Sequence, residues 1–192
     1  NTTDPITDYQ LSLISEEITG SNIFKVVKNG EVIYNKILNS GKLGDKDISE
    51  ETIFPIWSMS KPVTTVAMMI LYDRDMYKLD DKLSKYLPEY ENVTCKGEEG
   101  VYPCNNKIKV IDLLTHRSGY TYYSDVYGEN KFISQPSPLN KFTSSYYFDN
   151  LDDFSKAVAN HPLEFEPGSH YLYGLNQAIL GCLLYTSPSP RD

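Results

Sequence analysis

The fold of this 192-residue chain is decided by residues 56–65, which read IWSMSKPVTT. Before this stretch, the short apolar run 53–57 predicts a buried strand. After it, residues 63–71 are long enough for a helix, and because they are apolar almost all round we expect that helix to be buried. Proline is tolerated in the first turn of a helix but breaks a helix interior. Pro62 therefore places the helix start at or near Ser58.

Ser58 and Lys61 are three residues apart, a spacing that places both side chains on one face of a helix. A serine hydroxyl becomes a nucleophile when a base takes its proton, and a lysine can be that base when it is neutral. The positive field at a helix N-terminus favours the developing oxyanion. The alternative is an exposed serine beside a lysine, because S-x-x-K is a short pattern. The junction of strand and helix favours catalysis, since it presents both groups from rigid elements.

The longer segment 54–64, FPIWSMSKPVT, resembles the nucleophile segment of the serine β-lactamase-related superfamily. The nearest groups are class C β-lactamases, D-alanyl-D-alanine carboxypeptidases and β-lactamase-like esterases. The resemblance implies an α+β chain with the β-lactamase/transpeptidase-like fold, in which an antiparallel sheet flanked by helices adjoins a mostly helical subdomain. It also implies a serine hydrolase that acts through an acyl-enzyme on an ester, a peptide amide or a β-lactam.

Residues 167–181, PGSHYLYGLNQAILG, are similar to the second motif of that family, Y-x-N or Y-S-x. Tyr173 is the predicted third catalytic residue beside Ser58 and Lys61, with Tyr171 as the neighbouring alternative. A phenol beside a cationic lysine loses its proton more easily, so it can relay protons.

Position 175 departs from the pattern of the class C β-lactamases. Leu175 stands where those enzymes have asparagine, and Asn176 comes one place later and is expected to point elsewhere. This departure favours the esterase-like or peptidase-like branches over β-lactam hydrolysis.

Residues 108–120, IKVIDLLTHRSGY, resemble the family's helix that ends in L-L-T-H-x-S-G. His116 invites a catalytic interpretation, but the resemblance favours a structural role, because this helix end is structural in the family. The family also has glycine at the position of Asp75, where it would end the preceding helix in a left-handed conformation. Aspartate tolerates that conformation better than most residues, so we expect Asp75 to adopt it.

The N-terminal segment predicts a helix and a hairpin. Residues 5–19 have the periodicity of a helix, with Leu11, Ile14 and Ile18 on its apolar face. The runs 23–27 and 32–38 flank an Asn-Gly pair, the strongest short hairpin signal. A helix followed by an antiparallel hairpin favours an α+β fold.

The segment between the motifs predicts mostly irregular structure. Residues 89–107 are expected to form an irregular loop, and Asn150 or Asp152 is expected to cap a helix. Residues 120–148 are rich in tyrosine, serine, asparagine and proline, which predicts a long surface loop. That loop supports an alternative function, in which the protein is a non-catalytic relative that binds a ligand or partner through it.

Composition limits the partners that we expect. A net charge of −8 disfavours nucleic acid and anionic membrane surfaces. No apolar run approaches the roughly 20 residues that span a bilayer. The three histidines show no metal-ligand spacing, so no metal and no cofactor are predicted. The expected partner is a small-molecule or peptide substrate.

The cysteines and sequons favour an oxidising, extracytoplasmic compartment. Cys95 and Cys104 bracket a short loop and are predicted to form a disulfide, the alternative being two free surface cysteines. Asn1 and Asn92 begin sequons that permit glycosylation. We therefore expect a secreted or extracytoplasmic protein.

The resemblance extends to Gly181, so residues 1–181 are predicted to be a domain that is incomplete at its C-terminus. Residues 182–192 contain two prolines and are predicted to be a foreign tail outside the fold. The third motif of the family, K-T-G or H-x-G, is absent from the sequence, and the resemblance implies that its strand supplies the second oxyanion donor. We therefore expect these 192 residues alone to be inactive.

Overall fold

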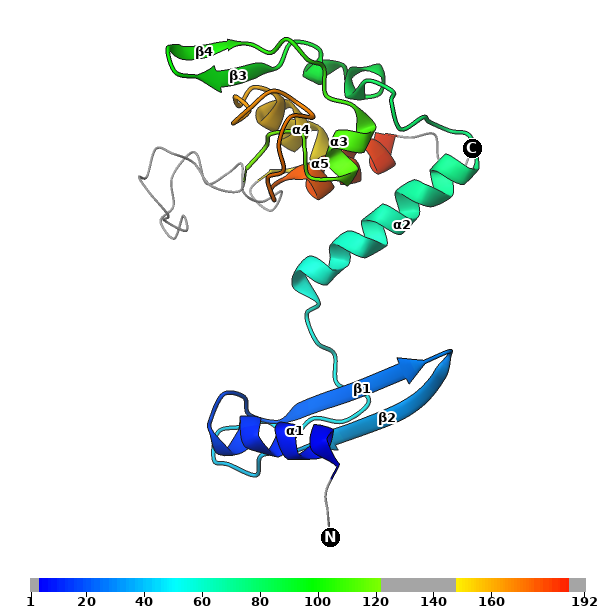
Figure 1. Ribbon diagram of the computed structural model, residues 1–192, viewed down its shortest axis with the longest axis vertical. Helices are drawn as coiled ribbons and strands as arrows, with labels where there is room; N and C mark the ends of the chain where they lie inside the picture. The colour runs from blue at the N-terminus through cyan, green and yellow to red at the C-terminus, as the bar shows by residue number, and fades with distance from the viewer. Residues whose placement is uncertain (1–3, 122–147, 187–192) are drawn as a thin grey trace. The chain divides into compact units, whose positions relative to one another are not determined.

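The computed structural model describes residues 4–121 and 148–186, which belong to two compact units, 1–56 and 57–192 (Figure 1). Unit 1 contains α1 (Pro5–Ser15), β1 (Asn22–Lys28) and β2 (Glu31–Leu38). Unit 2 contains η1 (Trp57–Met59), α2 (Ser60–Asp73), η2 (Leu83–Lys85), η3 (Pro88–Tyr90), β3 (Thr94–Gly97), β4 (Gly100–Pro103), α3 (Val110–Leu114), α4 (Leu151–Ala159) and α5 (Asn176–Thr186). Helices combined with two antiparallel hairpins confirm the predicted α+β class.

The hairpin of unit 1 forms where the sequence predicts it. β1 and β2 pair antiparallel, and the turn between them is made by Asn29 and Gly30. Both turn residues have positive φ, 51° and 81°, as a two-residue turn that matches the twist of the strands requires.

α1 is shorter than predicted and buries a different face. It ends at Ser15 because Glu17, with φ of 60°, leaves the helical conformation. Leu11 and Ile18 of the expected apolar face are exposed and Ile14 is only half-buried, so that prediction is wrong. Gln10 is buried instead and donates to Asn22 Oδ1 at 2.9 Å and to the Lys36 carbonyl at 3.1 Å. Polar groups on the hairpin therefore select the side of α1 that is buried.

The segment around the S-x-x-K motif differs from its prediction in two respects. Residues 53–57 form no strand, and Ile53 is exposed. Only Met68 of α2 is buried, whereas Val63 and Ile70 are exposed, because α5 is the main described element that packs against α2 and covers one side of it. Helix α2 ends at Asp73, and Asp75 has the expected left-handed conformation, with φ of 55°.

The core of unit 2 surrounds α5, which packs against α2, α3 and α4. Asn150 caps α4 as predicted, because its side chain accepts a hydrogen bond from the Asp153 backbone N–H at 2.8 Å. The largest buried apolar side chains of the core are Tyr90, Tyr120, Phe154, Met68, Leu83, Ile108, Leu113, Leu163, Ile179, Leu180 and Leu183. This core holds the loop after α3, which ends the segment 108–120, and the loop before α5, which carries Tyr173.

Residues 89–107 are more regular than predicted. They contain the antiparallel hairpin β3–β4, and the disulfide between Cys95 and Cys104 ties this hairpin to the segment that follows it. The backbone of Cys95 also forms an isolated parallel β-bridge with Leu163, and the Leu163 N–H donates to the Thr94 carbonyl at 2.7 Å. The compartment that this disulfide suggests stays a prediction.

The predicted domain boundary lies inside a helix. α5 continues through Gly181 to Thr186, and Cys182 and Leu183 are buried in the core. The assignment of residues 182–192 to a foreign tail stays a prediction. The tyrosine-rich segment 120–148 lies almost wholly outside the described residues. Within the described residues, no helix has the length and apolar character needed to cross a membrane.

Candidate functional site

Ser58 lies in the short helical turn η1, directly before α2 begins at Ser60. Trp57, the residue before it, has φ of 47°, an unusual left-handed conformation for a bulky side chain. Such conformations cost on the order of 1–3 kcal/mol and gather at functional sites. The sharp turn at Trp57 leaves the Ser58 side chain exposed at the N-terminal end of α2.

The structure brings Ser58, Lys61 and Tyr173 together. Lys61 Nζ donates to Ser58 Oγ at 3.1 Å, and the Tyr173 hydroxyl donates to the same oxygen at 2.8 Å. Lys61 Nζ also lies 4.8 Å from the centroid of the Tyr173 ring. The serine hydroxyl thus faces two groups that can receive its proton, and both lie within the range for direct proton transfer.

Tyr171, the neighbouring alternative, lies elsewhere. Its side chain is 67% exposed, and its ring contacts the His116 ring edge-on at 6.0 Å. Tyr173 is therefore the tyrosine of this motif that has the geometry for a role at Ser58.

The pKa of Tyr173 is lowered from its ordinary value, first by hydrogen bonding to Lys61 and next by the hydrogen bond to Ser58. Both interactions favour the phenolate, and the positive charge of Lys61 adds to the effect. A phenol with this shift gives up and takes back a proton nearer to neutral pH than an isolated tyrosine does.

Three polar side chains next to Tyr173 are linked by hydrogen bonds, and two of them are fully buried. Ser118 Oγ donates to Asn176 Oδ1 at 2.5 Å, and Asn176 Nδ2 lies 3.0 Å from His116 Nδ1. Ser118 and Asn176 have no exposed surface. The pKa of His116 is lowered, mainly because burial disfavours its charged form and also because Lys61 repels it. The described hydrogen bonds of Asn176 are with Ser118, His116 and the Leu172 carbonyl, and no local sequence pattern predicts its contact with His116.

Backbone contacts hold the segment of Tyr173 beside the end of α3. The Leu172 N–H donates to the His116 carbonyl at 2.8 Å, and the Gly168 N–H donates to the Arg117 carbonyl at the same distance. Gly174 is so close to the next segment that an added Cβ would lie 2.0 Å from the Tyr120 carbonyl oxygen. Only glycine fits there, so the position of Tyr173 is fixed from both sides.

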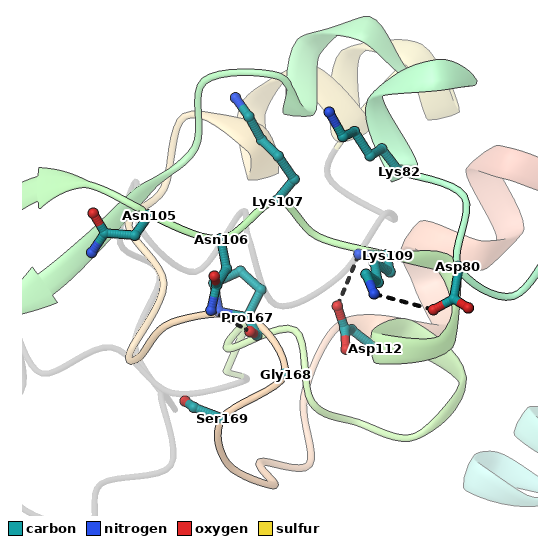
Figure 2. Close-up of a pocket in the computed structure, with 10 residues that line it drawn as sticks. All are labelled: Asp80, Lys82, Asn105, Asn106, Lys107, Lys109, Asp112, Pro167, Gly168 and Ser169. Atoms are coloured by element: carbon teal, nitrogen blue, oxygen red, sulfur yellow. Dashed lines mark hydrogen bonds and ion pairs between the residues drawn. The ribbon is translucent and has the colours of Figure 1, made fainter.

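A separate hollow of about 520 Å³ lies on another part of unit 2 (Figure 2). It is lined by Asp80, Lys82, Asn105, Asn106, Lys107, Lys109, Asp112, Pro167, Gly168 and Ser169. Lys109 pairs with Asp80 at 3.1 Å, Lys107 pairs with Glu91 at 2.9 Å, and Figure 2 shows Lys82 and Lys107 extending away from Ser169. The lysines do not converge on a common point, so the hollow has no evident anion site.

Among the described residues, the group with metal-ligand proximity is Cys95, Cys104 and Glu166. The two sulfur atoms are joined in a disulfide and are not thiolate ligands. The Glu166 carboxylate accepts hydrogen bonds from the backbone N–H groups of Asn105 and Asn106, both at 2.9 Å. These groups form a structural link rather than a metal centre.

Several known proteins are similar to this chain over most of its length. The esterase EstB of Burkholderia gladioli is 28% identical over 165 residues, which are 83% of this chain and 38% of EstB. The acyltransferase calJ of Penicillium decumbens is 27% identical over 167 residues, which are 81% of this chain and 37% of calJ. The solved structure of EstCE1, a hydrolase with promiscuous acyltransferase activity, matches with a TM-score of 0.74 at 26% identity. That match covers 95% of this chain and 46% of EstCE1.

These matches place the fold and the family. The chain spans less than half the length of each of these three relatives. The family model described as Beta-lactamase matches residues 20–186, a range that includes the β1–β2 hairpin and the segments 54–64, 108–120 and 167–181. Its structural relatives share the β-lactamase/transpeptidase-like fold, as the sequence predicted. The chain belongs to the Beta-lactamase family, within the serine β-lactamase-related superfamily.

Proposed function

We propose that the protein is a serine hydrolase that acts through an acyl-enzyme, with Ser58 as the nucleophile. The observation that carries this proposal is the pair of hydrogen bonds on Ser58 Oγ, from Lys61 at 3.1 Å and from Tyr173 at 2.8 Å. Activated nucleophiles of hydrolases have a base within hydrogen-bond reach, and here two candidates meet that condition.

The proposed reaction begins when Ser58 Oγ attacks the carbonyl carbon of the substrate. The serine proton passes to Tyr173 in its phenolate form or to Lys61 in its neutral form, while the carbonyl oxygen becomes an oxyanion. The Ser58 backbone N–H at the start of α2 is the expected oxyanion donor from this chain. When the tetrahedral intermediate collapses, the bond to the leaving group breaks, and the leaving group takes the proton.

The second half of the reaction returns the enzyme to its starting state. Water attacks the acyl-Ser58 carbonyl and gives one proton to the same Lys61–Tyr173 pair. Collapse of the second intermediate breaks the ester bond to Ser58 Oγ, which takes that proton back. The carboxylic acid is then released, the alcohol or amine having left in the first half of the reaction, and no redox partner is needed.

An ester is the substrate class that we favour. Leu175 occupies the position where class C β-lactamases have asparagine, and this departure weighs against a β-lactam as the substrate. The relatives EstB and EstCE1 are named as an esterase and as a hydrolase with acyltransferase activity. Peptide amides and β-lactams remain the substrates to compare against an ester.

The test is labelling of the full-length protein with a fluorophosphonate, followed by peptide mass spectrometry. We expect the label on Ser58, with labelling lost in Ser58→Ala. Ser60→Ala is the matched control, because Ser60 is an exposed serine two residues later, at the first position of α2, and the side-chain hydrogen bond described for it is the one that its carbonyl accepts from Thr64. Labelling that persists in Ser58→Ala, or no turnover of p-nitrophenyl esters by the wild-type protein, would contradict the proposal.

A further inference from the structure

We propose that His116 is a positioning residue, a neutral imidazole held by Asn176 and Ser118 whose ring fixes the Tyr173 hydroxyl against Ser58. The inference rests on the proposed function, because it assigns His116 a part in that reaction. It adds residues outside the proposed catalytic group of Ser58, Lys61 and Tyr173, because the described hydrogen bonds on Ser58 come from Lys61 and Tyr173 and not from Asn176 or Ser118.

The hydrogen-bond chain determines the tautomer of His116. Ser118 Oγ donates to Asn176 Oδ1 at 2.5 Å, which orients the amide so that its NH₂ group faces His116. That NH₂ group lies 3.0 Å from His116 Nδ1 and also donates to the Leu172 carbonyl at 3.4 Å. An amide NH₂ only donates, so Nδ1 must accept. His116 is therefore neutral, with its hydrogen on Nε2.

His116 contacts the tyrosine segment through both its ring and its backbone. Its ring centroid lies 4.8 Å from that of Tyr173, with the planes inclined by 30°. Its carbonyl accepts the Leu172 N–H at 2.8 Å, and its own φ of 55° turns the chain toward that segment. Tyr171 contacts the ring from another direction at 6.0 Å. The imidazole therefore packs against the Tyr173 ring and determines how far that ring reaches toward Ser58.

The groups around His116 explain why it must stay neutral. Lys61 of α2 faces the same Tyr173 ring, and among the described residues Tyr171 and Tyr173 are the titratable groups whose rings contact the imidazole. The guanidinium of the adjacent Arg117 donates a hydrogen bond to the Gly168 carbonyl. An imidazolium would set a donor against the Asn176 NH₂ group and a second cation beside Lys61. Both effects would push the ring away from its present position.

The decisive variant is Asn176→Asp, made in the full-length protein. A carboxylate accepts from Ser118 as the amide does, but it accepts rather than donates at His116 Nδ1. We expect His116 to take a proton at Nδ1, so that its titration moves to higher pH. The tautomer and titration are read by long-range proton–nitrogen correlation spectroscopy of the imidazoles. The acidic limb of kcat/KM for a p-nitrophenyl ester should move to higher pH in parallel.

A second variant, His116→Asn, removes the ring but keeps a residue that tolerates positive φ. We expect kcat to fall about 10–100-fold while KM stays within about twofold, because small displacements of a reacting group cost this much. His170→Asn is the matched control, since His170 contacts Ser169 and Phe165 rather than Tyr173. Its kinetics should equal those of the wild type.

The outcomes separate this inference from the proposed function. If the wild-type protein neither labels at Ser58 nor turns over esters, the proposed function is wrong. If it does both, and His116 carries its hydrogen on Nδ1 in the wild type, the positioning inference is wrong. It is also wrong if Asn176→Asp shifts neither the His116 titration nor the pH profile. The spectroscopic readout needs no activity, so it applies to a folded but inactive variant as well.

Discussion

The two sides of the candidate site are built in opposite ways. On the nucleophile side, Ser58 lies in an exposed turn beside Trp57, whose side chain is 81% exposed. On the tyrosine side, Ser118 and Asn176 are fully buried and hydrogen-bonded to each other. The reactive oxygen is thus accessible, while the group that would manage its proton is anchored in the core of unit 2. Substitutions at exposed reactive groups should alter chemistry alone, and substitutions in the buried part of the tyrosine side should alter stability.

The largest expected effect comes from Tyr173→Phe, which removes the hydroxyl that bonds Ser58 and keeps the ring against His116. Loss of a general acid–base group typically lowers the rate about 10²–10⁴-fold, and we expect kcat to fall within that range. The free energy of unfolding should change by less than about 0.5 kcal/mol, because the hydroxyl is not buried. Tyr171→Phe is the control and should leave ester turnover unchanged.

Gly174→Ala should damage both activity and stability. The added methyl group would lie 2.0 Å from the Tyr120 carbonyl oxygen, so the segment that carries Tyr173 must move. We expect a loss of about 1–3 kcal/mol in the free energy of unfolding and a fall of about 10²-fold in kcat. Gly181→Ala in α5 is the matched control, because nothing lies within 4 Å of its added Cβ. Urea unfolding and ester kinetics measure the two effects, and an unaffected Gly174→Ala protein would show that the close approach is not required.

Ser118→Ala tests the buried side alone. It leaves Asn176 Oδ1 without its donor in a site that has no exposed surface. An unsatisfied buried acceptor costs about 1–3 kcal/mol, which should appear in the free energy of unfolding. The Ser60→Ala protein should unfold like the wild type, since position 60 is exposed. Equal stability of the two variants would contradict the contrast between the two sides.

The smallest expected effect is a shift in pH dependence. Lys61 lowers the pKa of Tyr173, so the phenolate forms at lower pH than in an isolated tyrosine. If the phenolate accepts the serine proton, kcat/KM rises with pH as Tyr173 deprotonates. In Lys61→Met the lowering interaction is lost, so the Tyr173 titration should move up toward the ordinary value near 10. The difference in ultraviolet absorbance between Lys61→Met and the double variant with Tyr173→Phe reports the Tyr173 titration. A titration midpoint equal to that in the wild-type protein would refute the coupling.

The part of the site that could be predicted from sequence is the part that follows from spacing and motif. Ser58 and Lys61 are close because they are one helical turn apart, and the bracketed Tyr173 faces them as expected. Asn176 was not assigned a role because its partners, Ser118 and His116, are about 60 residues earlier and no local pattern reports such a contact. The Asn29–Gly30 hairpin was predictable for the opposite reason, since its turn is entirely local.

The wrong predictions concern burial and short strands. The apolar sequence of α2 predicts a buried helix, but burial also needs other elements to pack on each face. Among the described residues only Met68 of α2 is buried. The four-residue strands β3 and β4 are too short to give a clear alternating pattern, so the sequence of this region predicts an irregular loop. In α1, hydrogen bonds from Gln10 outweighed the apolar face that contains Leu11.

The most direct test of the central claim is trapping of the acyl-enzyme. The full-length protein would be mixed with a p-nitrophenyl ester, quenched in acid within its first turnover, and analysed by peptide mass spectrometry. The account predicts that the acyl group is on Ser58, accumulates more slowly in Tyr173→Phe and is absent from Ser58→Ala. An acyl group on another residue, or turnover by Ser58→Ala at the wild-type rate, would contradict it.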